Sequence, residues 1–132
     1  MAEQIVFKLD NAVYAQIVHG RGGPVDTDLR KRAERLRILA VRQVGKDTGR
    51  LARDIGVQMI PGPNGPTALV GSNNRIALIH HEGTRRHPIT ARPGRTLRFA
   101  HRGKIVYARK VMHPGTRPNR YLTDNLRRVV VD

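Results

Sequence analysis

The sequence lacks several residue types, and each absence removes a class of protein. The 132 residues contain no cysteine and no tryptophan, and aromatic residues make up only 4% of the chain. Without cysteine there is no disulfide scaffold, no thiolate zinc site and no cysteine nucleophile. No apolar run approaches the roughly 18–20 residues of a membrane-spanning helix, so we expect no membrane partner. The first residues also lack the pattern of a signal peptide, which predicts a protein of a reducing cytoplasm.

Acidic residues are few, and this imbalance is the strongest feature of the composition. Ten acidic side chains stand against 25 basic ones, which gives a net charge of +15, and 20 of the basic residues are arginine. Residues 1–74 carry a net charge of +4, whereas residues 75–128 carry 14 basic and two acidic side chains. Because arginine makes bidentate contacts with phosphate and carboxylate groups, the second half predicts a polyanion or an acidic protein as partner.

The length of the chain fits one domain, which we take as residues 1–132. Hydrophobic periodicity and turn residues predict an N-terminal arm and short helix over 1–23, a long helix over 24–45, β hairpins over 46–110 with a long polar loop at 80–95, and a turn and C-terminal helix over 111–132. We therefore expect an α+β fold in which the long helix packs on an antiparallel β-sheet of hairpins and a short helix closes the chain.

The long helix has the clearest pattern. Asp26, Thr27 and Asp28 place capping and acidic groups near its start, where the helix dipole favours them. Apolar residues then recur at intervals of three or four, which is the spacing of one helix face. This stripe predicts the helix core as Leu29, Ala33, Leu36, Ala40 and Val44. Arginines occupy the other faces, which fits a solvated surface and a contact surface equally well.

No arrangement of residues predicts catalysis, a metal site or a cofactor. The histidines of the second half lack the spacing of metal ligands, and His80 and His81 would point to opposite faces of a strand. Most carboxylates surround the long helix, where capping and ion pairing explain them. Ser72 is the only serine, and no glycine-rich phosphate motif is present. We therefore expect no enzyme, no bound metal and no cofactor.

Residues 81–85 and 113–117 share the pattern His-x-Gly-Thr-Arg. The repeat either arises by chance in a chain rich in arginine and glycine, or marks two turns in which glycine supplies a positive φ.

The loop at 80–95 and the hairpin at 96–108 concentrate the positive charge. We expect them to contact neighbouring subunits, DNA or acidic partner proteins. The residues that we expect to make these contacts, called the contact set below, are Arg85, Arg86, Arg92, Arg95, Arg98, Arg102 and Lys104.

Several segments, in order along the chain, resemble the neck and tail-component proteins of tailed phages. Residues 46–51 (KDTGRL) are similar to that family's Asp-Thr-Gly-x-Leu step after a long helix. Residues 77–84 (ALIHHEGT) are similar to its apolar run ending in His/Glu-x-Gly-Thr, and residues 117–122 (RPNRYL) to its closing proline-rich turn. Residues 103–116 resemble the actinobacteriophage-like members. The matching positions are Asp47, Thr48, Gly49, Leu51, His81, Gly83, Thr84, Pro118, Tyr121 and Leu122.

The resemblance implies a structural virion protein of the head–tail connector, whether a neck, head-closure, tail-completion or tail-terminator protein. It implies a homo-oligomeric ring, commonly a hexamer, that forms part of the DNA conduit. Its partners would be adjacent neck, stopper or adaptor and tail-tube proteins, with non-specific contact to genomic DNA. Its place would be the virion neck, after assembly in the bacterial host cytoplasm. The chain departs from the family at Lys46, where proline or valine is common, and over its first 20 residues.

The charge alone supports a second interpretation, a free-standing basic protein that binds nucleic acid without reading its sequence. No stacking pair of aromatics and no helix-turn-helix pattern accompanies the charge. A toxin-like nuclease is a weaker third interpretation, because the chain lacks the carboxylate or His–Lys constellation that such chemistry requires.

Overall fold

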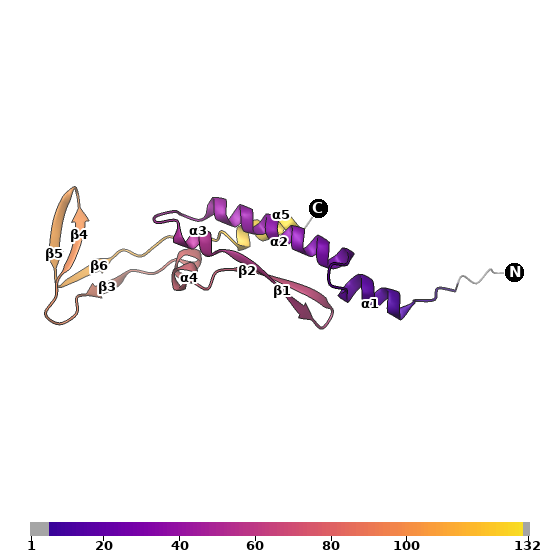
Figure 1. Ribbon diagram of the computed structural model, residues 1–132. Coiled ribbons are helices and arrows are strands. Elements are labelled where there is room, and N and C mark those ends of the chain that lie inside the picture. The colour runs from indigo at the N-terminus through magenta and orange to yellow at the C-terminus, as the bar shows by residue number, and fades with distance from the viewer. Residues whose placement is uncertain (1–5, 131–132) are drawn as a thin grey trace. The chain divides into compact units, whose positions relative to one another are not determined.

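The computed structural model describes residues 6–130, and its α+β fold confirms the class predicted from the sequence (Figure 1). The helices are α1 (Asn11–His19), α2 (Pro24–Gln43), α3 (Arg50–Asp54), α4 (Arg75–Glu82) and α5 (Thr123–Val130). The strands are β1 (Gly56–Gly62), β2 (Gly65–Gly71), β3 (His87–Thr90), β4 (Leu97–His101), β5 (Lys104–Ala108) and β6 (Lys110–His113). They pair as three antiparallel two-stranded ladders, β1–β2, β3–β6 and β4–β5.

The chain divides into two compact units. The first unit contains the residues up to Asn74 and those from Tyr121 onward, and the second unit contains residues 75–120. The sequence predicted one domain over 1–132, whereas in the structure residues 75–120 form a separate unit inserted between the two parts of the first. The two units are described separately below.

In the first unit, α2 packs on the β1–β2 hairpin and on α5. Four residues of the predicted stripe, Ala33, Leu36, Ala40 and Val44, are buried, and Leu29 is half-buried. The stripe is buried because its residues lie on one side of α2. This side faces the β1–β2 hairpin, where Leu36 lies near Ala68 and Val70.

The ends of α2 are set by local chemistry. Pro24 occupies the first helical position, where its missing N–H costs nothing. Asp26 lies in the first turn, and its Oδ2 accepts a hydrogen bond of 3.0 Å from the Gly22 N–H. The helix ends at Gln43, two residues before the expected boundary, and the Val44 N–H closes it on the carbonyl of Ala40.

The C-terminal helix α5 is fastened to α2 by polar contacts. The Asn125 side chain, itself buried, donates to Gln43 Oε1 at 2.7 Å and to the carbonyl of Tyr121 at 2.9 Å. Arg32 donates from a guanidinium nitrogen to the carbonyl of Val129 at 2.9 Å. The bonds of Gln43 with Asn125 and of Arg32 with Val129 join segments about 80 to 100 residues apart in sequence.

The second unit consists of α4 and the ladders β3–β6 and β4–β5. The segment 80–95, expected to be a loop, instead contains the last residues of α4 and the strand β3. Its partner β6 follows only after the β4–β5 hairpin, so no local turn signal marks the pairing. Arg102 and Gly103 form the two-residue turn of that hairpin with φ of 49° and 75°, as a type I′ turn requires.

Residues 50–54 form the helix α3, within the segment 46–110 in which the sequence predicted β hairpins. Residues 6–10, part of the N-terminal arm expected over 1–23, carry no regular secondary structure, and residues 1–5 lie outside the described residues. Asp10 then caps α1, because its Oδ1 accepts from the N–H groups of Ala12 and Val13.

Candidate contact surface

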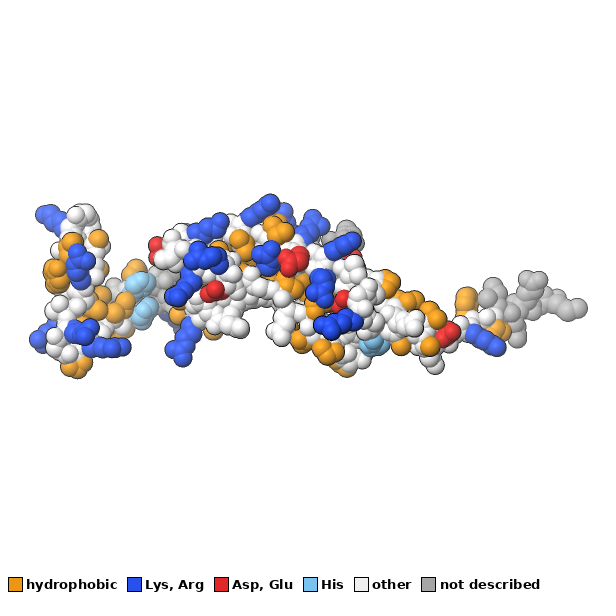
Figure 2. Space-filling view, in the orientation of Figure 1, with side chains coloured by type: hydrophobic (Ala, Val, Ile, Leu, Met, Phe, Trp, Pro, Cys, Tyr) orange, Lys and Arg blue, Asp and Glu red, His pale blue; other side chains and the backbone are white. Residues whose placement is uncertain are grey.

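Positive charge covers the second unit. Residues 75–120 contain 12 basic side chains and one carboxylate, Glu82, and each of the 12 basic residues is exposed. On the face drawn in Figure 2, blue Lys and Arg side chains outnumber red carboxylates. The second unit is therefore a cationic surface with almost no internal neutralisation.

The two units also differ in how many of their basic side chains form ion pairs. On α2, Arg30, Arg32 and Arg37 each lie within 4.0 Å of a carboxylate one helical turn away. In the second unit, the Glu82 carboxylate lies 2.6 Å from His81 Nδ1. Among residues 75–120, all of which are described, no arginine or lysine pairs with a carboxylate. These cations are available to an external anion without first breaking a native pair.

The contact set is spread along the second unit. Arg85 and Arg86 precede β3, Arg92 and Arg95 lie between β3 and β4, and Arg98, Arg102 and Lys104 belong to the β4–β5 hairpin. The contact set predicted from the sequence leaves out five other exposed basic residues of this unit. These are Arg75, Arg109, Lys110, Arg117 and Arg120.

The two His-x-Gly-Thr-Arg segments lie against each other. Thr84 and Thr116 form an antiparallel bridge in which each N–H donates to the other's carbonyl, at 3.0 and 3.1 Å. Gly83 and Gly115 have φ of 72° and 96°, so both repeats contain the positive-φ glycine that one interpretation of the sequence predicted. A Cβ at Gly83 would collide with the Thr116 carbonyl oxygen, and a Cβ at Gly115 with that of Thr84. The repeat thus forms a tight crossing of two chain segments at the base of the β3–β6 ladder.

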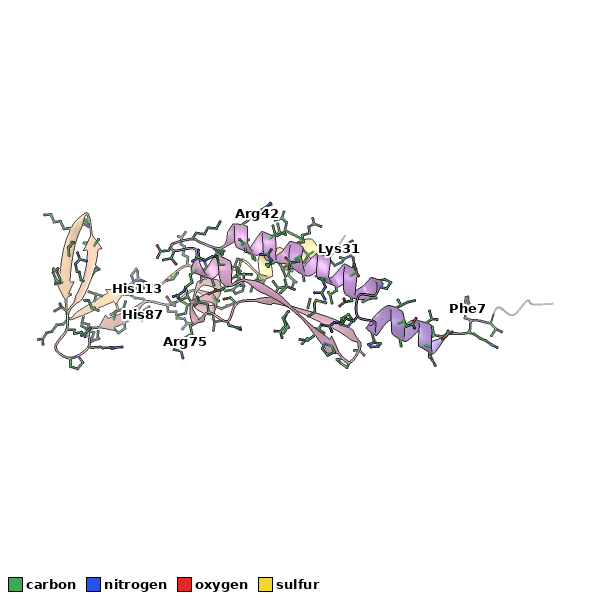
Figure 3. The ribbon with its side chains drawn as sticks, viewed as in Figure 1. Phe7, Lys31, Arg42, Arg75, His87 and His113 are labelled. Carbon is green, nitrogen blue, oxygen red and sulfur yellow. The ribbon has the colours of Figure 1, made fainter. Side chains whose placement is uncertain are left out.

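Two histidines, His87 and His113, lie beside this crossing. His87 and His113 are opposite each other in the β3–β6 ladder, with ring centroids 5.1 Å apart (Figure 3). His87 Nδ1 donates to the carbonyl of Arg85 at 2.8 Å, and His113 Nδ1 accepts from the Gly115 N–H at 3.0 Å. Within residues 6–130, no group of three or more His, Asp or Glu side chains is placed to hold a metal ion.

The first group of family-like positions organises the exit from α2. Gly49, with φ of 73°, precedes α3 in the left-handed conformation that glycine adopts without strain. Leu51 is buried in the core of the first unit, whereas Asp47 and Thr48 are exposed. The Asp-Thr-Gly-x-Leu segment therefore acts here as a turn with an apolar anchor that directs the chain from α2 into β1.

The remaining family-like positions lie in or just after α4, and around residues 118–122, where the chain returns from the second unit to the first. His81 lies in α4, and the backbone after it reaches the Gly83–Thr84 crossing. Pro118 is exposed, and Leu122 is half-buried just before α5. Tyr121 is only 1% exposed, and burial raises the pKa of its phenol above the usual 10.0.

The second unit has very little core of its own. Ala77 is its one buried apolar residue, and the β4–β5 ladder is a lone pair of strands. Such a two-stranded hairpin is marginally stable in water unless something packs on it. Apolar side chains nevertheless stand exposed on this unit, namely Ile76, Leu78, Ile79, Ile105, Tyr107 and Met112. Cationic and apolar side chains are thus both exposed on the second unit.

Comparison of the chain with family models, with curated proteins and with solved structures gave no match. None of the helices within residues 6–130 has the length and apolar character needed to cross a membrane.

Proposed function

We propose that the chain is a structural subunit of the head–tail connector of a tailed phage, a neck or tail-completion ring protein that contributes to the DNA conduit. One observation carries the proposal: the second unit presents 12 exposed cations and several exposed apolar side chains around a single buried residue. A unit built in this way gains most of its buried surface from neighbours, as a subunit of an assembly does.

The proposed assembly is a phage connector because three segments resemble phage neck proteins, namely residues 46–51, 77–84 and 117–122. In such a ring the subunits meet head to tail and close by rotation. Exposed arginines without carboxylate partners suit a conduit, because contacts to the DNA backbone are independent of sequence. Opposite charges on acidic neighbouring proteins would also steer the subunit into place.

A test follows from the contact set. In a phage that carries this gene, Arg85, Arg86, Arg98 and Arg102 are replaced by glutamine, and particles are counted by plaque assay and electron microscopy. We expect unjoined heads and tails, or particles that have lost their DNA. A control variant replaces Arg30 and Arg37 on α2, which already have carboxylate partners, and should give normal particles, whereas Arg98→Gln with Arg102→Gln, which removes the same number of charges, should impair joining. Normal infectious particles from the fourfold variant would contradict the proposal.

The β4–β5 hairpin favours a second candidate, a free-standing protein that binds nucleic acid without reading its sequence. A two-stranded ribbon fits the major groove of B-DNA, and Arg98, Arg102 and Lys104 would place three cations along it. Such a protein would occur mainly in the cell rather than in particles, and its DNA affinity would fall steeply with salt.

A further inference from the structure

The basic residues on the outer faces of α2 are of two kinds. Three of them have a carboxylate partner about one helical turn away, namely Arg30, Arg32 and Arg37. Within residues 6–130, no carboxylate pairs with the other three, Lys31, Arg35 and Arg42, and all three are exposed. Because 3.6 residues make one turn, positions 31, 35 and 42 fall on the side of α2 opposite its buried stripe. This side of the helix therefore carries positive charge that nothing in the described chain neutralises.

The unpaired cations line a groove that α2 forms with α5, and Figure 3 labels the first and the last of them, Lys31 and Arg42. The groove has a volume of about 650 Å³. Its lining also contains Ile38, Leu39 and, from α5, Arg128. The remaining lining residues are Arg30 and Glu34, each of which is held in an ion pair on α2. We call this site the α2–α5 groove.

Two apolar side chains lie among these cations. Ile38 is 43% exposed, and Leu39 is half-buried. Along the helix, Arg35 lies about one turn before Ile38, and Arg42 lies about one turn after Leu39. An occupant that neutralises the groove and also covers its apolar pair must combine negative charge with apolar side chains.

The side chains in the groove are arranged in the rows on which another helix packs. Residues four apart form ridges on a helix, and a second helix sets a ridge of its own between two such rows. On α2 the two rows are residues 31, 35 and 39 and residues 30, 34, 38 and 42, and all of them line the groove. From residue 30 to residue 42 the rows extend over about 18 Å, or roughly three helical turns. The α2–α5 groove thus suits a short amphipathic helix.

Charge selects an acidic protein as the source of that helix. A second copy of this chain is unsuitable, because it carries a net charge of +15 and none of its helices within residues 6–130 has more acidic than basic side chains. A nucleic-acid backbone would neutralise the cations, but its phosphates offer no apolar side chain to cover Ile38 and Leu39. An acidic helix with an apolar row meets both requirements.

We propose that the α2–α5 groove binds an acidic amphipathic helix of a partner protein. The apolar row of that helix lies on Ile38 and Leu39, and its carboxylates meet the cations of the groove, Lys31, Arg35, Arg42 and Arg128. The groove belongs to the first unit and shares no residue with the contact set. It is therefore an interaction surface beyond the one on which the connector function is proposed.

Two synthetic peptides test the apolar part of the groove. Both contain the same leucine, glutamate and alanine residues, but only in the patterned peptide does leucine recur every three or four residues, on one face of a helix. Binding of each labelled peptide to the full chain is measured by fluorescence anisotropy. The patterned peptide should bind about tenfold more tightly than the scrambled one, because it alone covers Ile38 and Leu39. Ile38→Ser should abolish this preference.

Charge-matched variants test the cationic part of the groove. Arg35→Gln with Arg42→Gln should lower the affinity for the patterned peptide by about tenfold. Arg98→Gln with Arg102→Gln removes the same net charge from the second unit and should leave this affinity nearly unchanged. Labelled duplex DNA is the second probe for all of these proteins, and melting curves verify that each variant is folded.

The outcomes separate this inference from its alternatives. A preference for the patterned peptide that is lost in the α2 variants and kept in the second-unit variant supports it. Equal binding of the two peptides, or binding of neither, would overturn it. Equal losses in the two charge variants would place the peptide outside the groove and overturn it. Duplex DNA bound through Arg35 and Arg42 without any peptide preference would make nucleic acid the occupant and overturn it as well. The connector function would stand in each case, because its test is the joining of particles.

Discussion

The two units of this chain reach a folded state by different means. Of the nine buried apolar residues among the described positions, eight lie in the first unit and only Ala77 lies in the second. The first unit balances most of its charge, with three Arg–carboxylate pairs on α2, whereas the second carries 12 cations and one carboxylate. The first unit is therefore stabilised mainly by its own core, whereas the second unit buries little apolar surface of its own.

The largest effect should come from the core of the first unit. Leu36→Asp buries a carboxylate at a position that is 6% exposed, which should cost several kcal/mol, order of magnitude. Ile38→Asp, on the same helix at a side chain 43% exposed, is the matched control and should change the melting temperature little. Thermal unfolding of both variants measures the difference. Equal melting temperatures would show that the stripe on α2 is not the core.

The crossing of the two repeats should be the most sensitive point of the second unit. Gly83→Ala adds a Cβ that collides with the Thr116 carbonyl oxygen, beyond the roughly 1–2 kcal/mol of a left-handed alanine. Gly94→Ala has a similar φ of 75° with open space around it, so it isolates the conformational cost. We expect faster amide exchange at Thr84 and Thr116 in Gly83→Ala only. Equal exchange in the two variants would mean that the close approach is unimportant.

Removal of two unpaired cations should weaken nucleic-acid binding more than removal of two paired ones. Arg98→Gln with Arg102→Gln should reduce the slope of log K against log salt by about 0.9 for each phosphate that the variant no longer neutralises. Arg30→Gln with Arg37→Gln removes the same charge from α2, where carboxylates already neutralise it. Titration of labelled duplex DNA at several salt concentrations gives both slopes. Equal reductions would indicate that net charge alone governs binding.

The smallest effect concerns alkaline pH. Burial raises the pKa of Tyr121 above 10.0, so the folded state keeps a proton that the unfolded state releases above that pH. The stability that this group contributes is fully present below pH 10 and is lost as the pH rises further. Tyr121→Phe should therefore remove part of the alkaline loss of stability. Denaturant midpoints of both proteins at pH 8 and above pH 10 measure it, and parallel curves would contradict the assignment.

Local chemistry made much of the first unit predictable. The apolar stripe of α2 and the capping carboxylate of Asp10 act within a few residues of the structures that they define. The hairpin turns at Pro63–Asn64 in the first unit and at Arg102–Gly103 in the second unit are local in the same sense. Where a helix or turn is determined by residues that are neighbours in the sequence, the sequence alone predicts it, with boundaries correct to within a few residues.

The second unit was harder because its pairing is long-range. The strand β3 pairs with β6, but the β4–β5 hairpin lies between them in the sequence, and no turn residue indicates this pairing. The repeat at 81–85 and 113–117 was visible in the sequence, but the bridge between Thr84 and Thr116 required the structure. Charge counting located the cationic segment, whereas the lack of carboxylate partners around its arginines depends on three-dimensional placement.

The most direct test of the assembly account is the composition of purified particles. Quantitative mass spectrometry of gradient-purified phage from the source lysate compares the amount of this chain with that of the portal protein. If the chain is a connector subunit, it should be present in particles at a fixed ratio to the portal protein. Its absence from particles, while it is abundant in infected cells, would contradict the connector function and leave a nucleic-acid partner to explain the net charge of +15.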